Sequence, residues 1–328
     1  MYGSPYRGVL TGLNEAFVID GATKQRLMAQ DAKSADLLKP FLEGKDLKKW
    51  RVEPRDLWLI LCAKGWTRAR SGFADEPQAW AWLQSHYPAI AAYLAPFAEA
   101  AKKRTDKGEF WWELRACAYF DIFEKHKLIY PEISQGSKFI IEKSRLYGNK
   151  TVYSLPSFDW FLAGLLNSKI IWHYLSDVCS ALRGGEWRLM LQTIYIETLP
   201  IPNASPEQRT HIAQLAESCQ TAAEARRNAE IAFTRRIPDL AGTSQVKLST
   251  KLQQWWLLDF AGFRAEILKN FKAEIPLKDR NDWQDLFTQQ QSLIRELSQH
   301  IQLAEQQLNR AVYTLFGLDE AEIALIEM

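Results

Sequence analysis

Cysteine and histidine are scarce in this sequence of 328 residues. The four cysteines, Cys62, Cys117, Cys179 and Cys219, lie far apart and form no C-x-x-C pair. The five histidines form no H-E-x-x-H sequence. This spacing indicates neither a disulfide framework nor a zinc site. We therefore expect the cysteines to be buried thiols.

Long apolar runs are also missing. No window reaches the roughly 18 uncharged apolar residues that a membrane span needs, and the first residues show no signal-peptide pattern. We therefore expect a cytoplasmic protein without a membrane partner. Hydrophobic residues make up 47% of the chain, so it can bury a core, and its length suggests about two domains.

Two motif classes are excluded by the positions of proline and glycine. All 13 prolines are isolated, so the proline-proline tetrapeptide of amine methyltransferases does not occur. The 16 glycines form neither G-x-G-x-x-G nor the G-x-x-x-x-G-K-[ST] phosphate loop. The sequence therefore supports neither a nucleotide-driven motor nor a dehydrogenase.

Charge is unevenly distributed along the chain. Residues 1–200 contain 27 Lys and Arg against 22 Asp and Glu, whereas residues 201–328 contain 14 against 17. Ten of the 13 tryptophans also precede residue 200. Positive charge with large planar side chains is typical of nucleic-acid surfaces, although buried tryptophans and solvated lysines give the same counts in many enzymes. The second part is predicted to be a poor phosphate-binding surface.

A domain boundary is predicted near residue 202, because residues 199–206 contain three prolines. Ser205, Pro206 and Gln208 then form a helix start with a capping box, and the helical pattern continues to about Ile237. We therefore divide the chain into residues 1–202 and residues 203–328.

The second domain is predicted to be all-helical. Further helices are expected from Ser249 to Pro276 and from Asp282 onward, and apolar residues between Ile294 and Leu315 recur at the spacing of a coiled-coil seam. Such seams need partners, so we expect a bundle or an antiparallel hairpin, with a helix-mediated dimer as an alternative.

The first domain is predicted to be α+β, with an irregular mixed sheet. Helices are expected over 77–103 and 157–175, and the second of these places Phe158 and Trp160 in the core. Strand patterns lie at 8–19 as a strand, turn and strand, at 58–61, at 127–130, and at 139–141 and 151–155 as a hairpin around 147–149.

An acidic cluster offers a different function. Glu43-Gly44-Lys45 and Asp46-Leu47-Lys48 have the acid-x-Lys form of metal-dependent nucleases. Such triplets also arise by chance in a chain with 24% charged residues. Their position in a turn before Trp50 favours a structural or phosphate-contacting role over magnesium binding by Glu43 and Asp46.

Several stretches occur in the order in which a known family carries them. They are RGVLTGLNEAFVID at 7–20, LKPFLEGKDL at 38–47, RTDKG at 104–108, WWELR at 111–115, IYPEI at 129–133, LLNSK at 165–169, RGG at 183–185, LPIP at 199–202 and VYTLFGLDEAEI at 312–323. Together they resemble the TaqI-like C-terminal specificity domain of adenine-specific methyltransferases in restriction-modification systems, including type IIG enzymes.

This resemblance implies recognition of a specific double-stranded DNA sequence without catalysis in this chain. The methyltransferase region of the family, with its S-adenosylmethionine site, has no counterpart in these residues. It is expected in the same polypeptide or in a separate subunit, where an endonuclease region is also expected, so no cofactor is assigned here. A helical interaction scaffold is the remaining alternative.

Candidate DNA-binding residues follow from the chemistry of a duplex reader, which needs Lys and Arg for phosphates and a few side chains for base edges. Arg183 and Arg188 flank a glycine pair that would let the backbone approach a phosphate closely, although they could instead pair with Glu186. The candidates are Lys48, Lys49, Lys102, Lys103, Arg104, Lys107, Trp112, Arg115, Lys138, Lys143, Arg145, Asn149, Arg183, Gly184, Gly185 and Arg188.

Overall fold

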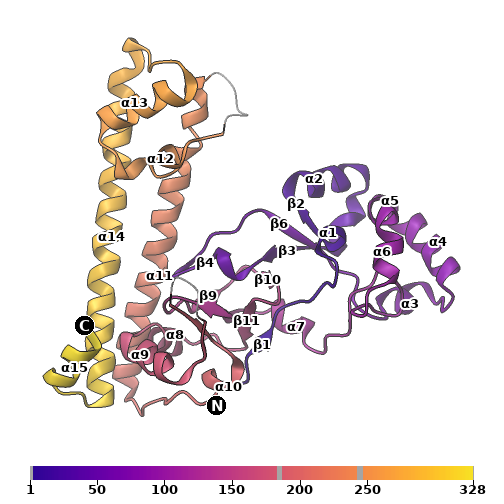
Figure 1. The fold of residues 1–328 in the computed structure, drawn as a ribbon, viewed down its shortest axis with the longest axis horizontal. Helices are drawn as coiled ribbons and strands as arrows, with labels where there is room; N and C mark the ends of the chain where they lie inside the picture. The colour runs from indigo at the N-terminus through magenta and orange to yellow at the C-terminus, as the bar shows by residue number, and fades with distance from the viewer. Residues whose placement is uncertain (1–2, 183–186, 242–246, 328) are drawn as a thin grey trace. The chain divides into compact units, whose positions relative to one another are not determined.

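The computed structural model describes residues 3–182, 187–241 and 247–327. The chain forms two compact units, which are residues 1–203 with 324–328 and residues 204–323 (Figure 1). Within the described ranges, no helix has the length and apolar character needed to cross a bilayer.

The strands of the first unit are short, and they form four small sheets in the part of the chain that the structure describes. The first sheet has the order β1 (Tyr6–Arg7), β11 (Val152–Leu155), β7 (Lys127–Pro131) and β9 (Ile140–Glu142). The second has the order β10 (Tyr147–Gly148), β3 (Leu38–Leu42), β6 (Leu57–Ile60) and β2 (Val18–Asp20). The smaller sheets are β12 (Ala181–Leu182), β13 (Arg188–Met190) and β8 (Ile133–Ser134), and the pair β4 (Leu47–Lys48) and β5 (Arg51–Val52).

Helices separate these strands along the chain. They are α1 (Asn14–Phe17), α2 (Gly21–Gln30), η1 (Ala32–Leu37), η2 (Gly44–Asp46), α3 (Trp66–Ser71), α4 (Glu76–His86), α5 (Pro88–Leu94), η3 (Ala95–Phe97), α6 (Ala98–Lys102), α7 (Phe120–Phe123), α8 (Trp160–Leu166), α9 (Lys169–Val178) and α10 (Thr193–Ile196). The predicted α+β class with small mixed sheets is therefore confirmed.

Two strand predictions are wrong. β9 and β11 do not form a hairpin, because β7 lies between them and pairs with both. The intervening Tyr147 is buried and pairs instead with Phe41 of β3 in the second sheet. At 8–19 the chain forms α1 before β2 in place of a second long strand, and Thr11 donates a hydrogen bond to Asn14 at the start of this turn.

The second unit is a helical hairpin. Its two long helices, α11 (Pro206–Thr234) and α14 (Arg280–Phe316), pack against each other along their length (Figure 1). The predicted capping box of Ser205 and Gln208 is present. The second predicted helix is broken. Shorter elements at the turn of the hairpin are η4 (Ile237–Ala241), α12 (Thr250–Gln253), η5 (Trp255–Leu257), α13 (Phe260–Phe271) and η6 (Leu277–Asp279), and α15 (Glu320–Glu327) follows α14.

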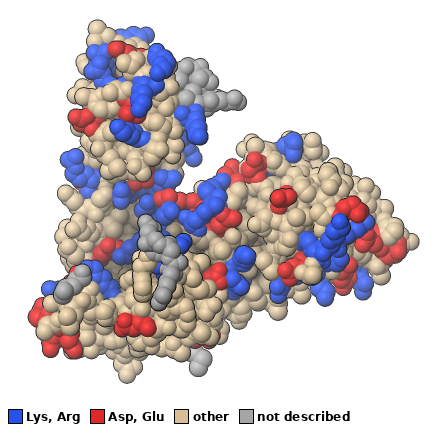
Figure 2. All heavy atoms as spheres, viewed as in Figure 1, with Lys and Arg blue, Asp and Glu red and all other residues tan. Residues whose placement is uncertain are grey.

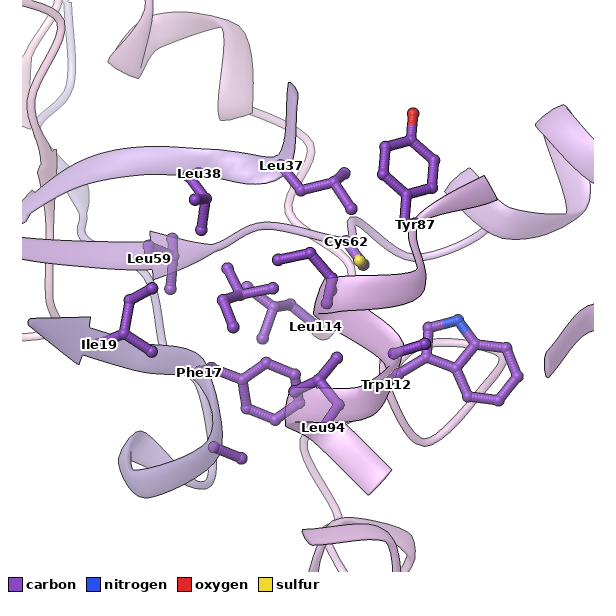
Figure 3. Packing of buried hydrophobic residues seen from close by; sticks show 14 of the residues in the cluster. Phe17, Ile19, Leu37, Leu38, Leu59, Cys62, Tyr87, Leu94, Trp112 and Leu114 are labelled. Carbon is purple, nitrogen blue, oxygen red and sulfur yellow. The ribbon is translucent and has the colours of Figure 1, made fainter. Parts of the chain in front are cut away.

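The main core of the first unit lies between the second sheet and the helices α1 and α5. Figure 3 shows Phe17, Ile19, Leu38 and Leu59 converging there, and all four are at most 5% exposed. Trp112 is fully buried in this core, and its indole N–H donates to Thr67 Oγ1 at 2.9 Å. Burial of a large aromatic side chain with its N–H paired stabilises this part of the fold.

Two buried charges tie the surrounding loops together. Arg104 donates hydrogen bonds to the carbonyl oxygens of Thr11, Trp111 and Glu113 at 2.5, 2.6 and 3.0 Å. Its guanidinium also lies 4.3 Å from the centre of the Phe17 ring. Burial lowers the pKa of Arg104 to about 10, which leaves it protonated at neutral pH. The cation therefore supplies donors to carbonyl groups that strands do not satisfy.

Glu113 performs the complementary task. Its carboxylate is fully buried and accepts the backbone N–H groups of Gly65, Thr67 and Glu109 at 2.9 to 3.0 Å. The start of α3 and the loop before Glu113 are held by this one side chain. Hydrogen bonds to a charged group are stronger than those between neutral groups.

Replacing Arg104 with Met should lower the free energy of unfolding by about 3 kcal/mol, because it leaves buried carbonyl groups without donors. Urea denaturation of the variant measures this loss. Because the side chain is internal, the folded variant should keep any base preference that the parent chain has. A variant with parental stability and an altered base preference would contradict the internal role of Arg104.

Candidate nucleic-acid interface

A surface groove of the first unit brings together four of the candidate DNA-binding residues. Lys48 comes from β4, Lys138 precedes β9, Asn149 follows β10, and Arg188 begins β13. The groove has a volume of about 530 Å³, and the remaining residues that line it are Glu43, Gly44, Lys45, Ile133, Ser134, Gln135 and Thr151. Side chains from four separate segments therefore meet at one surface.

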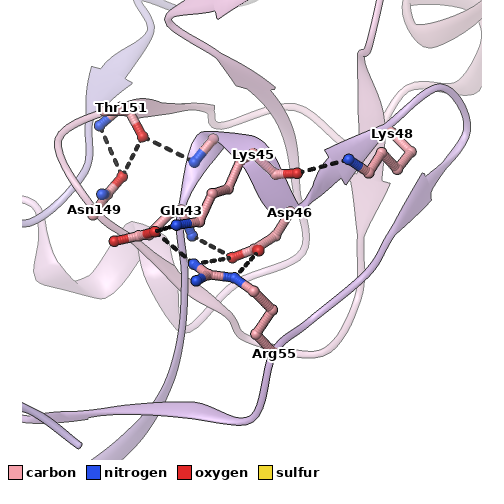
Figure 4. Close-up of polar contacts among 8 residues, drawn as sticks. Glu43, Lys45, Asp46, Lys48, Arg55, Asn149 and Thr151 are labelled. Atoms are coloured by element: carbon pink, nitrogen blue, oxygen red, sulfur yellow. Dashed lines mark hydrogen bonds and ion pairs between the residues drawn. The ribbon is translucent and has the colours of Figure 1, made fainter. Parts of the chain in front are cut away.

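Hydrogen bonds fix the backbone of this groove, and one of them comes from the Lys48 ammonium, which donates to the carbonyl of Lys45 at 3.0 Å (Figure 4). Gly44 N donates to Thr151 Oγ1 at 2.9 Å, and the same hydroxyl donates to Asn149 Oδ1 at 2.5 Å. Gly8 packs closely against this turn, since a Cβ there would lie 2.1 Å from the carbonyl oxygen of Asn149. The Asn149–Thr151 turn is thus pinned to both β3 and the start of the chain.

Glu43 and Asp46 are held by Arg55 rather than facing an open cation site. Arg55 Nε lies 2.5 Å from Asp46 Oδ1, and Arg55 Nη2 lies 2.5 Å from Glu43 Oε2 (Figure 4). Burial raises the pKa of Glu43, but hydrogen bonds from Lys45 and Arg55 outweigh this effect and lower it. The carboxylates are therefore ion-paired structural groups, which disfavours magnesium binding by this pair.

The remaining cations of the groove carry charge that no carboxylate neutralises. Among the described residues, neither Lys48, Lys138 nor Arg188 has an Asp or Glu oxygen within 4 Å. Burial and the nearby charge of Lys48 both lower the pKa of Lys138. Like charges held close together favour a polyanionic ligand, because its binding relieves their repulsion.

Asn149 has one polar atom left for a ligand. Its side-chain oxygen accepts two hydrogen bonds from Thr151, through the backbone N–H at 2.9 Å and through the hydroxyl. In the described part of the chain, the amide nitrogen of Asn149 donates no hydrogen bond. This fixed orientation presents a donor to the groove.

A second set of candidates lies around residues 102–115, outside the lining of the groove. Lys102 lies 3.8 Å from Glu76, Lys107 donates to the carbonyl of Lys102 at 2.5 Å, and Arg115 lies 3.3 Å from Asp106. Lys103 is exposed. Arg115 therefore forms an ion pair with Asp106.

Lys143 and Arg145 are exposed after β9, and Lys49 is half-buried after β4. The Lys143 ammonium lies 5.0 Å from the centre of the Trp160 ring and 5.7 Å from that of Phe158. Phe158 is 48% exposed, so its predicted place in the core is wrong. The expected hairpin support for Lys143 and Arg145 is absent as well, because β9 and β11 are not paired with each other.

Two of the predicted DNA-binding residues are buried, so these two predictions are wrong, and three others lie outside the described residues. Trp112 is fully buried, and Arg104 is 8% exposed with its donors on internal carbonyl groups, so neither side chain can contact DNA in the folded chain. The candidates Arg183, Gly184 and Gly185, and the alternative partner Glu186, lie outside the described residues.

Sequence reasoning missed Lys45 as a residue of the groove. Lys45 lines it next to Lys48 and lies 3.0 Å from Glu43. Its position in the Glu43-Gly44-Lys45 triplet was the available signal, but the triplet form directed attention to a metal site. Figure 2 shows that Lys and Arg gather in several places over the first unit, so surface charge alone does not select this groove.

Comparison with known proteins gives matches for most of the chain. Residues 39–201 match the family model of the TaqI-like C-terminal specificity domain, and residues 205–312 match a domain of unknown function (DUF8810). No curated protein matches the sequence. The predicted resemblance also included residues 7–20 and 312–323, which lie outside the specificity-domain match.

The solved structures include a similar fold. It is that of the type IIL restriction-modification enzyme MmeI in complex with DNA, with 15% sequence identity and a TM-score of 0.55. The match covers 98% of this chain and 34% of the enzyme, so the chain spans about a third of that protein's length. With the family match, this similarity confirms the resemblance found in the sequence: residues 39–201 match the TaqI-like C-terminal specificity domain, and the chain shares the fold of part of MmeI.

Proposed function

We propose that the first unit recognises a short sequence in double-stranded DNA, and that the groove of Lys48, Lys138, Asn149 and Arg188 contacts the duplex. The single observation that supports this most strongly is the meeting of these four side chains in one groove with three cations that have no carboxylate partner among the described residues. The similar enzyme MmeI is in complex with DNA.

Within the groove, different side chains suit different tasks. Arg188 is exposed at the start of β13, and a guanidinium on a strand can bind guanine through two hydrogen bonds. Lys48 and Lys138 are point charges suited to phosphate oxygens. Asn149 offers a single amide donor for a base edge or a phosphate. We propose this division between reading and positioning.

The chain would then be the specificity part of an adenine-specific methyltransferase or a type IIG restriction enzyme. Methyl transfer and S-adenosylmethionine binding would belong to a methyltransferase region in the same polypeptide or in a separate subunit. The catalytic steps of such an enzyme, including any cleavage, would likewise lie outside residues 1–328. The side chains of the groove bind and orient DNA, and none is assigned a reacting role.

Groove variants test the proposed division. Arg188→Gln should relax the preference at one base position and cost about 1–3 kcal/mol of specific binding free energy. Lys138→Gln should weaken binding to all duplexes alike and lower the salt slope, which is the steepness of log affinity against log salt concentration, by about 1. Selection from a random duplex pool and anisotropy titrations at several salt concentrations measure these effects. Lys125→Gln is the matched control, because Lys125 is exposed and pairs with Asp121 on α7. Parental binding by both groove variants would refute the interface.

The nuclease alternative is tested by Asp46→Asn. Because Asp46 is buried and holds Arg55, the variant should lose about 2 kcal/mol of unfolding free energy. This loss should be the same with and without Mg²⁺ in thermal or urea denaturation. If Mg²⁺ stabilises the parent chain but not the variant, Asp46 is a metal ligand and the structural assignment fails.

A further inference from the structure

The helical unit has opposite charge at its two ends. Residues 235–241 and 247–280, which we call the tip, contain nine Lys and Arg against five Asp and Glu. The other residues of 204–323 contain five Lys and Arg against eleven Asp and Glu. The helical unit therefore has a negative net charge as a whole, although its tip has a positive net charge. The expectation of a poor phosphate surface treats the region as uniform, which it is not.

The tip is a packed structure rather than a loose connection. Trp255 and Phe263 of the tip form a core with Phe233 of α11 and Phe287 of α14, and the ring centres of Phe233 and Trp255 are 4.0 Å apart. Gln291 of α14 donates to the carbonyl oxygens of Trp256 and Leu258 at 3.0 and 2.7 Å. Cations on this surface are therefore held on a fixed support.

Most of the tip's carboxylates already have partners. Glu266 lies 3.5 Å from Lys251, Glu274 lies 3.6 Å from Arg280, and Asp259 accepts the N–H of Gly262 as a helix cap. Six exposed cations have no carboxylate oxygen within 4 Å among the described residues; they are Arg235, Arg236, Lys247, Lys269, Lys272 and Lys278. Figure 2 shows Lys and Arg gathered over the α12 and α13 end of this unit.

Exposed leucines accompany these cations, so an anionic membrane must be weighed as a partner. Leu257, Leu268 and Leu277 are 72%, 45% and 78% exposed. A helix that binds a membrane surface presents a continuous apolar face. In α13, however, Phe263 and Ile267 are buried in the core of the tip, so its main apolar face is already covered. The six cations without carboxylate partners among the described residues outnumber the three exposed leucines. This balance favours a nucleic acid over a membrane as the partner.

We propose that the tip is a second, sequence-independent contact to the phosphate backbone of double-stranded DNA. This inference rests on the proposed function, because it takes duplex DNA as the partner of the chain. Exposed lysines and arginines displace counterions from phosphates and carry no base information. The tip would thus raise affinity for every duplex, while the groove would determine which duplex is preferred.

The test uses the full chain and two pairs of substitutions on the helical unit. Lys269→Gln with Lys272→Gln removes two of the six cations of the tip that have no carboxylate partner among the described residues, and Arg295→Gln with Arg310→Gln removes two cations of α14 outside the tip as a control. We expect the tip variant to bind all duplexes about 3- to 10-fold more weakly near 100 mM salt and to lower the salt slope by up to about 2. The base preference and melting temperature should equal those of the parent, and the control should bind like the parent.

A groove variant measured in parallel separates this inference from the proposed function. If Lys138→Gln with Arg188→Gln weakens binding and the tip variant does not, the tip contact is refuted while the groove stands. If neither variant changes duplex binding, the proposed function itself fails. Loss of binding to phosphatidylserine vesicles by the tip variant, with unchanged duplex binding, would overturn the inference and assign the tip to a membrane.

Discussion

Buried charges that bind backbone groups are the interactions on which the first unit depends. Its strands are two to five residues long, so sheet ladders leave many internal carbonyl and N–H groups without partners. Arg104 supplies donors to five carbonyl groups, and Glu113 supplies acceptors to three N–H groups. Without such side chains, an irregular sheet of this kind would bury unsatisfied polar groups at a cost of roughly 1–3 kcal/mol each.

Buried polar side chains also bind backbone groups near β7 and β9, on the side of the chain that leads to Lys138. Lys127 is fully buried between Glu142 Oε2 at 2.5 Å and the carbonyl of Phe123 at 2.9 Å. Asn167 accepts the N–H of Phe139 at 3.2 Å and donates to its carbonyl at 2.6 Å, which anchors the chain next to Lys138. Charged and amide side chains therefore give precise positions to loops that regular secondary structure does not reach.

The parts of the fold that local sequence determines were predictable. Ser205 and Gln208 specify a helix start within a few residues, and the apolar segments 58–61 and 127–130 become β6 and β7. Pairing between distant segments was not predictable: Tyr147 looked like part of a hairpin turn, yet its burial against β3 places it in another sheet. The sequence likewise supplied Lys48, Lys138 and Arg188 as cations, but only the folded chain brings them to one groove while directing Arg104 inward.

The side chains that shape the backbone of the groove differ from those that project into it. Gly8, Gly44 and Thr151 hold the turn at Asn149, whereas Lys48 and Arg188 project from strand ends without sustaining that turn. Exchanging a projecting side chain costs little folding free energy, whereas adding a Cβ at Gly8 would displace the Asn149 carbonyl. If the groove binds DNA as proposed, single substitutions of these projecting side chains would change the preferred sequence at little cost in folding free energy.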